Sequence, residues 1–175
     1  MINFPNTKIE KAAAVKGARY YLYDPYYDAE TKQVIATDGY ILAILPATNT
    51  DSQLSGPIPI TAIKQARKLD KTALQIDLSS TEHAETMDSM KAPRPDVQFP
   101  DFKRIIKEPQ EDDFTLGIDA ALLFKLSEAL NNSKKSSVKL RFSRDSRGEP
   151  DFNSSIRVEV NADDDRFGVI MPMRT

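Results

Sequence analysis

The sequence predicts an α+β protein that is assembled from a repeated β-α-β-β unit. A short strand-like segment, a helix-like segment and further extended segments recur in this order three times along the 175 residues. Each helix-like segment has a single apolar face, and the extended segments are rich in tyrosine and β-branched residues, which pack well on a pleated surface. We therefore expect sheets that are backed by helices on one face.

The first unit opens with a strand at Ile2–Phe4, followed by a helix that we expect from Thr7 to about Lys16. Thr7 is a suitable N-cap, and Glu10 follows three residues later, as in a capping box. Gly17 provides the stop signal. The segments expected next are a tyrosine-rich strand, a turn, a long strand and a polar loop, at Arg19–Tyr23, Asp28–Lys32, Gln33–Leu45 and Pro46–Gly56.

The second unit begins with a strand at Pro57–Ile60 and a helix from Thr61 to Leu69. Lys91–Pro95 cannot form a central strand, because its two prolines remove donors from the ladder. The strands expected after the helix are Ala73–Leu78, a pair within Thr81–Lys91, and Asp96–Phe99.

The third unit has the clearest pattern. A strand at Phe114–Ile118 leads to Asp119, which is a suitable N-cap for a helix at Ala120–Leu130. Apolar residues follow helical spacing at Leu122, Leu123, Leu126, Ala129 and Leu130. Two alternating strands place Val138, Leu140, Phe142, Ile156, Val158 and Val160 on a buried face, and the last strand is expected at Arg166–Met173.

Composition restricts the classes of function. The chain has a net charge of −2 and no cysteine, which excludes a disulfide framework and suits a reducing cytoplasm. Charged residues interrupt the apolar runs, so we expect no membrane-spanning segment, and Met1–Pro5 lacks the layout of a signal peptide. Without an overall positive field, any DNA contact must come from a local arrangement of charge.

Three apolar strings far apart in the sequence carry glycine or proline where the backbone must turn. They are Ala36–Ala43 (ATDGYILA), Phe99–Ile106 (FPDFKRII) and Val169–Arg174 (VIMPMR). In this order, with repeated units between them, they resemble the segments of the bacterial DNA polymerase III β sliding clamp that converge in its peptide-binding pocket. The resemblance implies a DNA-clamp-like fold, in which repeated units form a ring with sheets outside and helices around the central hole.

The same resemblance divides the chain. Residues 1–103 are similar to the middle domain of the clamp and hold two of the repeated units, residues 104–113 form a charged connector, and residues 114–175 resemble half of the last domain. The resemblance covers most of this chain but only about half of the length of the family's chain.

The resemblance also implies a site for linear peptides of polymerases or repair proteins. Gly39 allows close approach of backbone, Leu42 and Val169 can wall an apolar cleft, and flexible methionines can accept varied anchors. Tyr40 and Ile41 stand where the family has a basic pair, which makes one wall more apolar. The alternative is that these residues only join two sheets. The positions that match the pocket are Thr37, Gly39, Leu42, Pro100, Arg104, Ile105, Val169, Met171, Pro172 and Met173.

A basic stripe on the second helix is the candidate contact to double-stranded DNA. Its residues recur at i, i+3, i+4 and i+7, opposite the apolar face, which allows phosphate contacts that do not depend on base sequence. The alternative is a solvated helix face, and Glu128 argues against a uniformly basic lining on the third helix. The candidate DNA contacts are Lys64, Arg67, Lys68 and Lys71, with Lys8 and Lys11 from the first helix.

The sequence thus predicts a non-enzymatic, cytoplasmic processivity factor of DNA replication or repair that needs no cofactor. If the family ring counts twelve repeated units, four chains with three units each would close a homo-oligomeric ring. A ringless peptide-binding adaptor or decoy of a phage or mobile element is one alternative. A metal-binding enzyme on a borrowed fold is the other, supported only by His83 and the acidic turn Asp163–Asp165.

Overall fold

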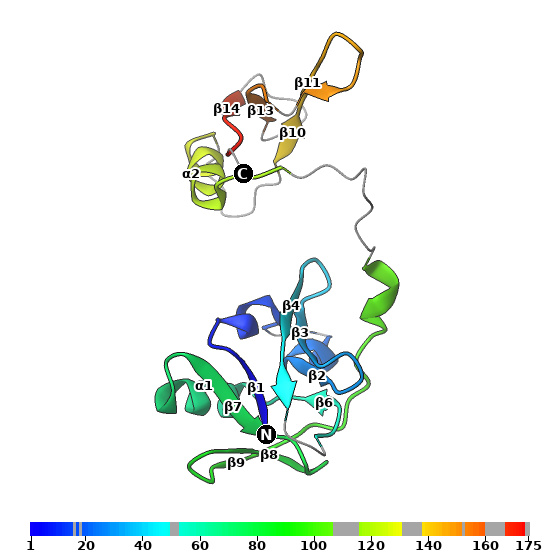
Figure 1. Cartoon of the computed structure of the whole chain (residues 1–175), viewed down its shortest axis with the longest axis vertical. Coiled ribbons are helices and arrows are strands. Elements are labelled where there is room, and N and C mark those ends of the chain that lie inside the picture. Colours follow the sequence, from blue (N-terminus) through cyan, green and yellow to red (C-terminus); the bar gives the residue numbers. More distant parts are fainter. Residues whose placement is uncertain are drawn as a thin grey trace. The chain divides into compact units, whose positions relative to one another are not determined.

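The computed structural model describes residues 1–15, 17, 19–49, 53–106, 116–130, 138–151, 153–159 and 167–173 (Figure 1). The chain divides into two compact units, Met1–Ile106 (unit 1) and Lys107–Thr175 (unit 2). Each unit has its own apolar core, and each is described by itself.

Unit 1 consists of two halves, which we define as residues 1–49 and residues 53–106. The first half contains β1 (Ile2–Pro5), the 3₁₀ helices η1 (Ile9–Ala12) and η2 (Tyr20–Leu22), β2 (Tyr26–Asp28), β3 (Gln33–Thr37), β4 (Leu42–Pro46) and β5 (Thr48–Asn49). The second half contains β6 (Gly56–Pro57), α1 (Ile60–Leu69), β7 (Ala73–Asp77), β8 (His83–Thr86), β9 (Lys91–Pro93) and the 3₁₀ helix η3 (Phe102–Ile105).

The two halves exchange their first strands. One sheet has the order β5-β1-β7-β8-β9, and the other has the order β4-β3-β2-β6, and neighbouring strands in both sheets are antiparallel. In the first sheet, β1 pairs with β7 of the second half from Ile2↔Ile76 to Pro5↔Ala73, and Figure 1 shows the two strands side by side. In the second sheet, β6 pairs with β2 of the first half. Neither sheet is therefore complete without the other half.

Side chains reinforce this exchange. Arg67 of α1 donates to both carboxylate oxygens of Glu10 in η1, at 2.6 and 2.8 Å, and to the carbonyl of Thr7. Asp24 of the first half accepts a hydrogen bond from the backbone N–H of Ile60, at the first residue of α1. That contact satisfies one of the N–H groups that a helix leaves unpaired at its start, so the first half caps the helix of the second.

Arg94 holds the second half together at the end of β9. Its guanidinium is buried and donates to four backbone carbonyls, those of Leu54, Pro57, Leu78 and Ser80, at 2.6 to 3.3 Å. Burial lowers the pKa of Arg94. Buried carbonyl groups need a hydrogen-bond donor, and this one side chain supplies donors to the carbonyls of several loops around β6.

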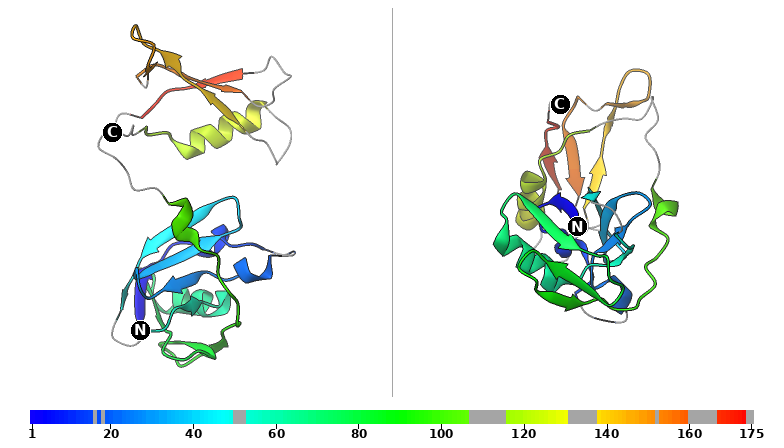
Figure 2. Two further views of the ribbon diagram at one scale, coloured as in Figure 1. Left: turned by 90° about the vertical axis from the view of Figure 1, so that its right-hand side faces the viewer. Right: turned by 60° about the horizontal axis from the view of Figure 1, so that its bottom comes forward.

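Unit 2 contains a single β-α-β-β unit in the part of the chain that the structure describes. Its elements are α2 (Ala120–Leu130), β10 (Lys139–Arg141), β11 (Ser143–Arg144), β12 (Pro150–Asp151), β13 (Ile156–Glu159) and β14 (Phe167–Ile170). The sheet has the order β10-β13-β14, and α2 lies along one of its faces (Figure 2). Ile156, Val158 and Ile170 form the buried centre of this core.

Several predicted elements are confirmed. Helix α1 starts one residue before the predicted Thr61 and ends at Leu69, β7 ends one residue before the predicted Leu78, and α2 has the predicted bounds. Asp119 caps α2, because its carboxylate accepts hydrogen bonds from the backbone N–H groups of Ala121 and Leu122. Ile156 and Val158 are fully buried, as the alternation predicts.

The predicted strand at Ile2–Phe4 is confirmed as β1, but the predictions for the two segments that follow it are wrong. The expected helix from Thr7 is only the short η1, and the tyrosine-rich segment Arg19–Tyr23 contains η2 in place of a strand. Glu10 does not complete a capping box, because its carboxylate binds Arg67. The predicted end at Lys16 lies outside the described residues.

The predictions of two further strands are also wrong. The long strand Gln33–Leu45 is a hairpin, in which β3 and β4 pair across a turn at residues 38–41. Asp96–Phe99 joins no ladder, and it is held by the ring of Phe99, which stacks on Tyr26 with a centroid separation of 4.8 Å.

In unit 2, the apolar spacing of helix α2 predicts a wider buried face than the structure has. Leu123 and Leu126 pack on the sheet, but Leu122 and Ala129 are exposed. Of the expected strand Phe114–Ile118, residues 116–118 are described, and Gly117 bridges to Met173. Val160 and the acidic turn at 163–165 lie outside the described residues.

The Arg67–Glu10 contact gives a prediction for stability and its pH dependence. Hydrogen bonding to Arg67 lowers the pKa of Glu10 below its ordinary value of 4.5. The contact therefore stabilises the fold above about pH 4.5, and this contribution is lost as the pH falls through the lowered pKa. Glu10→Gln should reduce the free energy of unfolding by about 1–2 kcal/mol at pH 7 and by much less near pH 3. Urea denaturation of both proteins at the two pH values measures this, and an equal difference at both would contradict it.

Candidate peptide-binding cleft and basic helix

The sequence Thr37-Asp38-Gly39 folds the turn of the β3–β4 hairpin. The carboxylate of Asp38 accepts hydrogen bonds from the backbone N–H groups of Tyr40 and Ile41, at 2.8 and 3.0 Å. These two bonds lower the pKa of Asp38. The hydroxyl of Thr37 accepts from the N–H of Gly39 and donates to the carbonyl of Ile41. Where the chain reverses, hydrogen bonds from the short polar side chains of Thr37 and Asp38 thus take the place of the backbone hydrogen bonds between the two strands.

Glycine is required at the tip of this turn. Gly39 has a φ of +91°, which L side chains rarely adopt, and a Cβ at this position would lie 1.8 Å from Nη1 of Arg19. That guanidinium nitrogen donates to the carbonyl of Asp38 at 2.8 Å, and the guanidinium lies over the ring of Tyr40. Arg19 therefore packs directly against the backbone of the turn and supports it.

The segment Phe99–Phe102 forms the opposite side of the site. Phe99 stacks on Tyr26 and meets Phe102 edge to face. The next residue, Lys103, forms ion pairs with Asp28 and Glu30 at the end of β2, at 3.4 and 2.5 Å. These contacts fix the segment against the first half of unit 1.

Between the turn and this segment lies an open cleft with a volume of about 410 Å³. Four predicted pocket residues, Thr37, Gly39, Leu42 and Pro100, line it together. Tyr40 and Ile41, which also line the cleft, are 87% and 54% exposed. The other lining residues are Arg19, Tyr21, Leu22, Phe99, Asp101 and Phe102.

Arg104, another predicted pocket residue of unit 1, is not among the residues that line this cleft. Arg104 is largely exposed and pairs with Asp101 at 2.8 Å. Ile105 belongs to η3. In unit 2, Val169, Met171 and Met173 alternate along the extended chain and are 54%, 62% and 55% exposed, so they form an apolar stripe that faces solvent within this unit.

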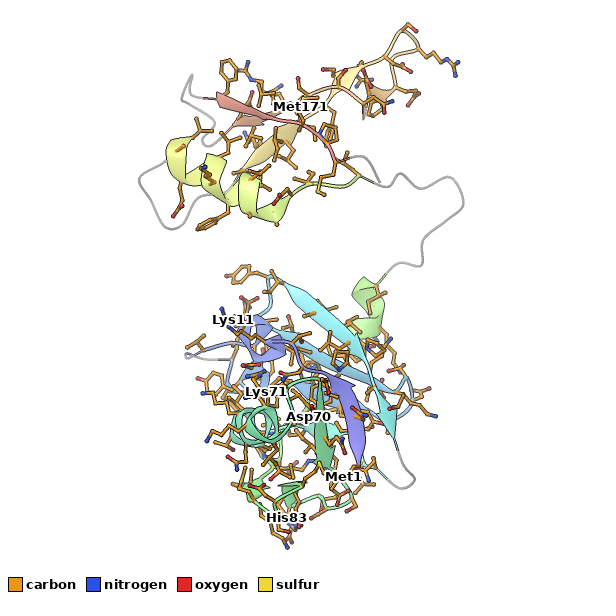
Figure 3. All side chains as sticks on the ribbon, turned by 60° about the vertical axis from the view of Figure 1, so that its left-hand side comes forward. Met1, Lys11, Asp70, Lys71, His83 and Met171 are labelled. Carbon is orange, nitrogen blue, oxygen red and sulfur yellow. The ribbon has the colours of Figure 1, made fainter. Side chains whose placement is uncertain are left out.

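The end of this stripe is fixed within unit 2. The backbone N–H of Met173 donates to the carbonyl of Gly117 at 2.8 Å, which places Pro172 in an extended segment beside the start of α2. Ile170, between Val169 and Met171, points to the opposite side and is buried in the core. Figure 3 shows Met171 directly after β14.

Sequence reasoning missed Arg19, Tyr21 and Leu22 as site residues. The sequence predicts a strand at Arg19–Tyr23, whereas η2 turns these residues toward the hairpin. Two features of the sequence could have indicated these residues. One is the Asp38-Gly39 pair, which is typical of a tight turn, and the other is the tyrosine-rich segment that begins with Arg19. Their proximity depends on the fold and not on sequence spacing.

The basic stripe on α1 is divided by the structure. Lys64, Lys68 and Lys71 are exposed, but Arg67 turns toward η1 and binds Glu10. Lys8, at the N-cap of η1, is also exposed. Lys11 and Lys71 both lie on the α1 side of unit 1 (Figure 3). The solvent-facing cations of this surface are therefore lysines, and Arg67 is part of the internal structure.

The metal-binding alternative depends on His83 and on the acidic turn at 163–165, and the acidic turn lies outside the described residues. No group of three or more His, Asp or Glu side chains within the described residues could hold a metal ion. His83 lies in β8, where its Nδ1 is 3.2 Å from the hydroxyl of Ser80, and Figure 3 places it far from Lys11. In the same described ranges, no helix combines the length and apolar character needed to cross a membrane.

Solved structures of bacterial sliding clamps share the fold of this chain. The chain matches the β sliding clamp of C. crescentus with a TM-score of 0.68 and 20% identity, over 98% of this chain and 50% of that one. It matches two DNA polymerase sliding clamp structures from Pseudomonas aeruginosa with a TM-score of 0.59, one with a ligand and one bound to griselimycin. Identities there are 19% and 18%, over 99% and 100% of this chain and 66% of each clamp.

The chain has the fold of the bacterial DNA polymerase III β sliding clamp. This confirms the predicted α+β, clamp-like architecture. The chain spans about half to two thirds of the length of these clamp structures. The sequence itself matches no protein-family model and no curated protein.

The turn gives a second prediction. Gly39→Ala should lower the free energy of unfolding of unit 1 by about 2 kcal/mol, because it strains the backbone and displaces Arg19 from Asp38. Gly17→Ala is the matched control, since Gly17 also has a positive φ but no atom within 4 Å of the added Cβ. Denaturant unfolding compares the two variants. Equal losses would show that Arg19 contributes nothing to the turn.

Proposed function

We propose that this chain is a cytoplasmic, non-enzymatic sliding-clamp-like protein of DNA replication or repair, which binds linear peptide segments of polymerases or repair proteins. The cleft between the β3–β4 turn and Phe99–Phe102 carries this proposal. It is lined by four of the residues that match the peptide pocket of the clamps, and the chain has the clamp fold.

The cleft suits an extended peptide with apolar anchors. Leu22, Leu42 and Phe102 contribute apolar side chains to its lining, and the cleft is open to solvent. Tyr40 and Ile41 stand at the positions of a basic pair in the clamps. We therefore expect a preference for apolar and aromatic anchors over acidic ones.

We propose the stripe of Val169, Met171 and Met173 on unit 2 as a further surface that binds peptides. Its side chains are exposed although they are apolar, and their positions match the family's pocket. Methionine adapts its shape to different partners, which suits a site that binds several peptides.

The lysines around α1 support a second part of the proposal, a contact to double-stranded DNA that does not depend on base sequence. Lys64 and Lys68 lie on the solvent side of a helix whose Ala62, Ile63 and Ala66 are buried. Side chains of this kind neutralise phosphates and permit sliding. The net charge of −2 keeps this attraction local and weak.

Peptide binding can be measured by fluorescence anisotropy with a labelled clamp-binding peptide that carries glutamine and leucine anchors. We expect a dissociation constant on the order of micromolar. Ile41→Glu and Met171→Glu should each weaken binding about tenfold or more, because each places a charge in an apolar contact. Met87→Glu is the control, since Met87 is as exposed as these residues but lies outside the cleft.

If all four proteins bind equally, the proposed site is wrong. If only Ile41→Glu weakens binding, the cleft of unit 1 acts alone and the stripe of unit 2 is not part of the site.

DNA binding can be tested by its salt dependence. The double variant Lys64→Glu and Lys68→Glu should reduce the slope of log K against log salt by about 2, since each phosphate contact contributes about 0.9. The double variant Lys32→Glu and Lys91→Glu changes the net charge equally at exposed sites outside the stripe. The same reduction in both variants would show that overall charge, and not the α1 surface, attracts DNA.

A further inference from the structure

The sheet of unit 2 has a second face, on the side away from α2. Helix α2 packs on the side of Leu140, Val158 and Ile170 (Figure 2). Successive side chains of a strand point to opposite faces, so the alternate residues of β10, β13 and β14 lie on the other side, which we call the outer face. The residues of the outer face are Lys139, Arg141, Arg157, Glu159, Phe167 and Val169.

Cations predominate on the outer face. Its described residues include three cations and one carboxylate, and Lys139, Arg141 and Arg157 are exposed. In the ladder, Arg141 lies directly opposite Arg157. Like charges in directly opposed positions destabilise a pair of strands, and a bound anion would offset that cost. The arginine pair therefore points to an anionic ligand.

Glu159 orients both guanidinium groups. Its Oε1 accepts from Nε of Arg141 at 2.8 Å and from Nε of Arg157 at 3.0 Å. Both contacts use Nε, which leaves the Nη groups available to a ligand within the described part of the chain. The side chain of Glu159 is 16% exposed, whereas those of Arg141 and Arg157 are 68% and 46% exposed. A ligand thus meets the two guanidinium groups first, and one carboxylate does not neutralise both.

Phe167 adds an aromatic surface beside these cations. The guanidinium of Arg157 lies over its ring, 3.7 Å from the ring centroid. The ring is nevertheless 49% exposed. A guanidinium stacked on an aromatic ring forms a flat, cationic surface, and nucleobases stack on both kinds of group.

We propose that the outer face of unit 2 binds single-stranded nucleic acid. Phosphate oxygens accept hydrogen bonds from Lys139 and from the Nη groups of Arg141 and Arg157, and a base stacks on the pair of Phe167 and Arg157. Guanidinium groups bind phosphate oxygens in a bidentate manner, which matches the free Nη groups. A duplex offers the same phosphates, but its bases are stacked on one another, so it cannot use the ring.

An acidic peptide is the competing ligand, since carboxylates also bind arginine. Carboxylates account for the cations of the outer face but not for the exposed ring that carries one of them. The combination of ring and guanidinium therefore favours a nucleic acid. This inference rests on the outer face alone, and depends neither on peptide binding nor on the lysines of α1.

Fluorescence anisotropy of the full chain with a labelled oligothymidine of about 16 nucleotides tests the proposal. Phe167→Ala should weaken binding about tenfold, because a base loses its stacking partner, and should leave the affinity for a duplex of the same length unchanged. Phe124→Ala is the matched control, since Phe124 is 66% exposed on α2, and it should bind like the wild type. Equal wild-type affinities for oligothymidine and for an abasic strand of the same length would overturn the proposal.

The salt dependence tests the phosphate contacts. Arg141→Gln combined with Arg157→Gln should reduce the slope of log K against log salt by about 1.4, since each contact to a single strand contributes about 0.7. Lys125→Gln combined with Arg147→Gln changes the net charge equally at exposed sites of unit 2 outside the outer face. The same reduction in both double variants would contradict the proposal. Equally effective displacement of the strand by oligoglutamate of the same charge would assign the face to acidic peptides instead.

A spectroscopic measurement covers the case in which Phe167→Ala affects folding. The chain has no tryptophan, so Phe167→Trp introduces a single indole and keeps an aromatic ring at this position. Its emission should be quenched when oligothymidine binds, because a base stacks on the indole. Phe124→Trp is the control and should keep its emission. Unchanged emission of Phe167→Trp at saturating oligothymidine, or equal quenching of the two variants, would overturn the stacking contact and the proposal with it.

Discussion

The structure of unit 1 depends on one constraint: a β-α-β-β half leaves a sheet edge and a helix flank uncovered. An open edge exposes a row of unpaired N–H and C=O groups, and a half-covered helix loses much of the packing that keeps it folded. The sister half removes both problems. It supplies β1 to β7, receives β6 beside β2, and caps α1 through Asp24.

The cleft is a consequence of the same pairing. One wall is the β3–β4 turn of the first half with Arg19, and the other is Phe99–Phe102 of the second half. Phe99 reaches its position because its ring stacks on Tyr26 of β2, and Lys103 fixes the end of the segment against Asp28. The site can therefore exist only where the two halves are already joined, although its walls lie about 60 residues apart in the sequence.

This explains what could be predicted from the sequence. Helices α1 and α2 follow a local apolar period, and Asp119 caps α2 through its own neighbours, so sequence alone located them. Glu10 failed as a capping residue because its carboxylate is taken by Arg67, which is 57 residues away. Arg19 was missed for the same reason, since its partner is the backbone of Asp38 across the cleft. The resemblance of three motifs to the clamps found Thr37, Gly39, Leu42 and Pro100, which local patterns could not connect.

The contact between the halves of unit 1 follows from how the halves are connected. They belong to one chain, so their effective concentration is high and a polar contact such as Arg67–Glu10 is enough to align them.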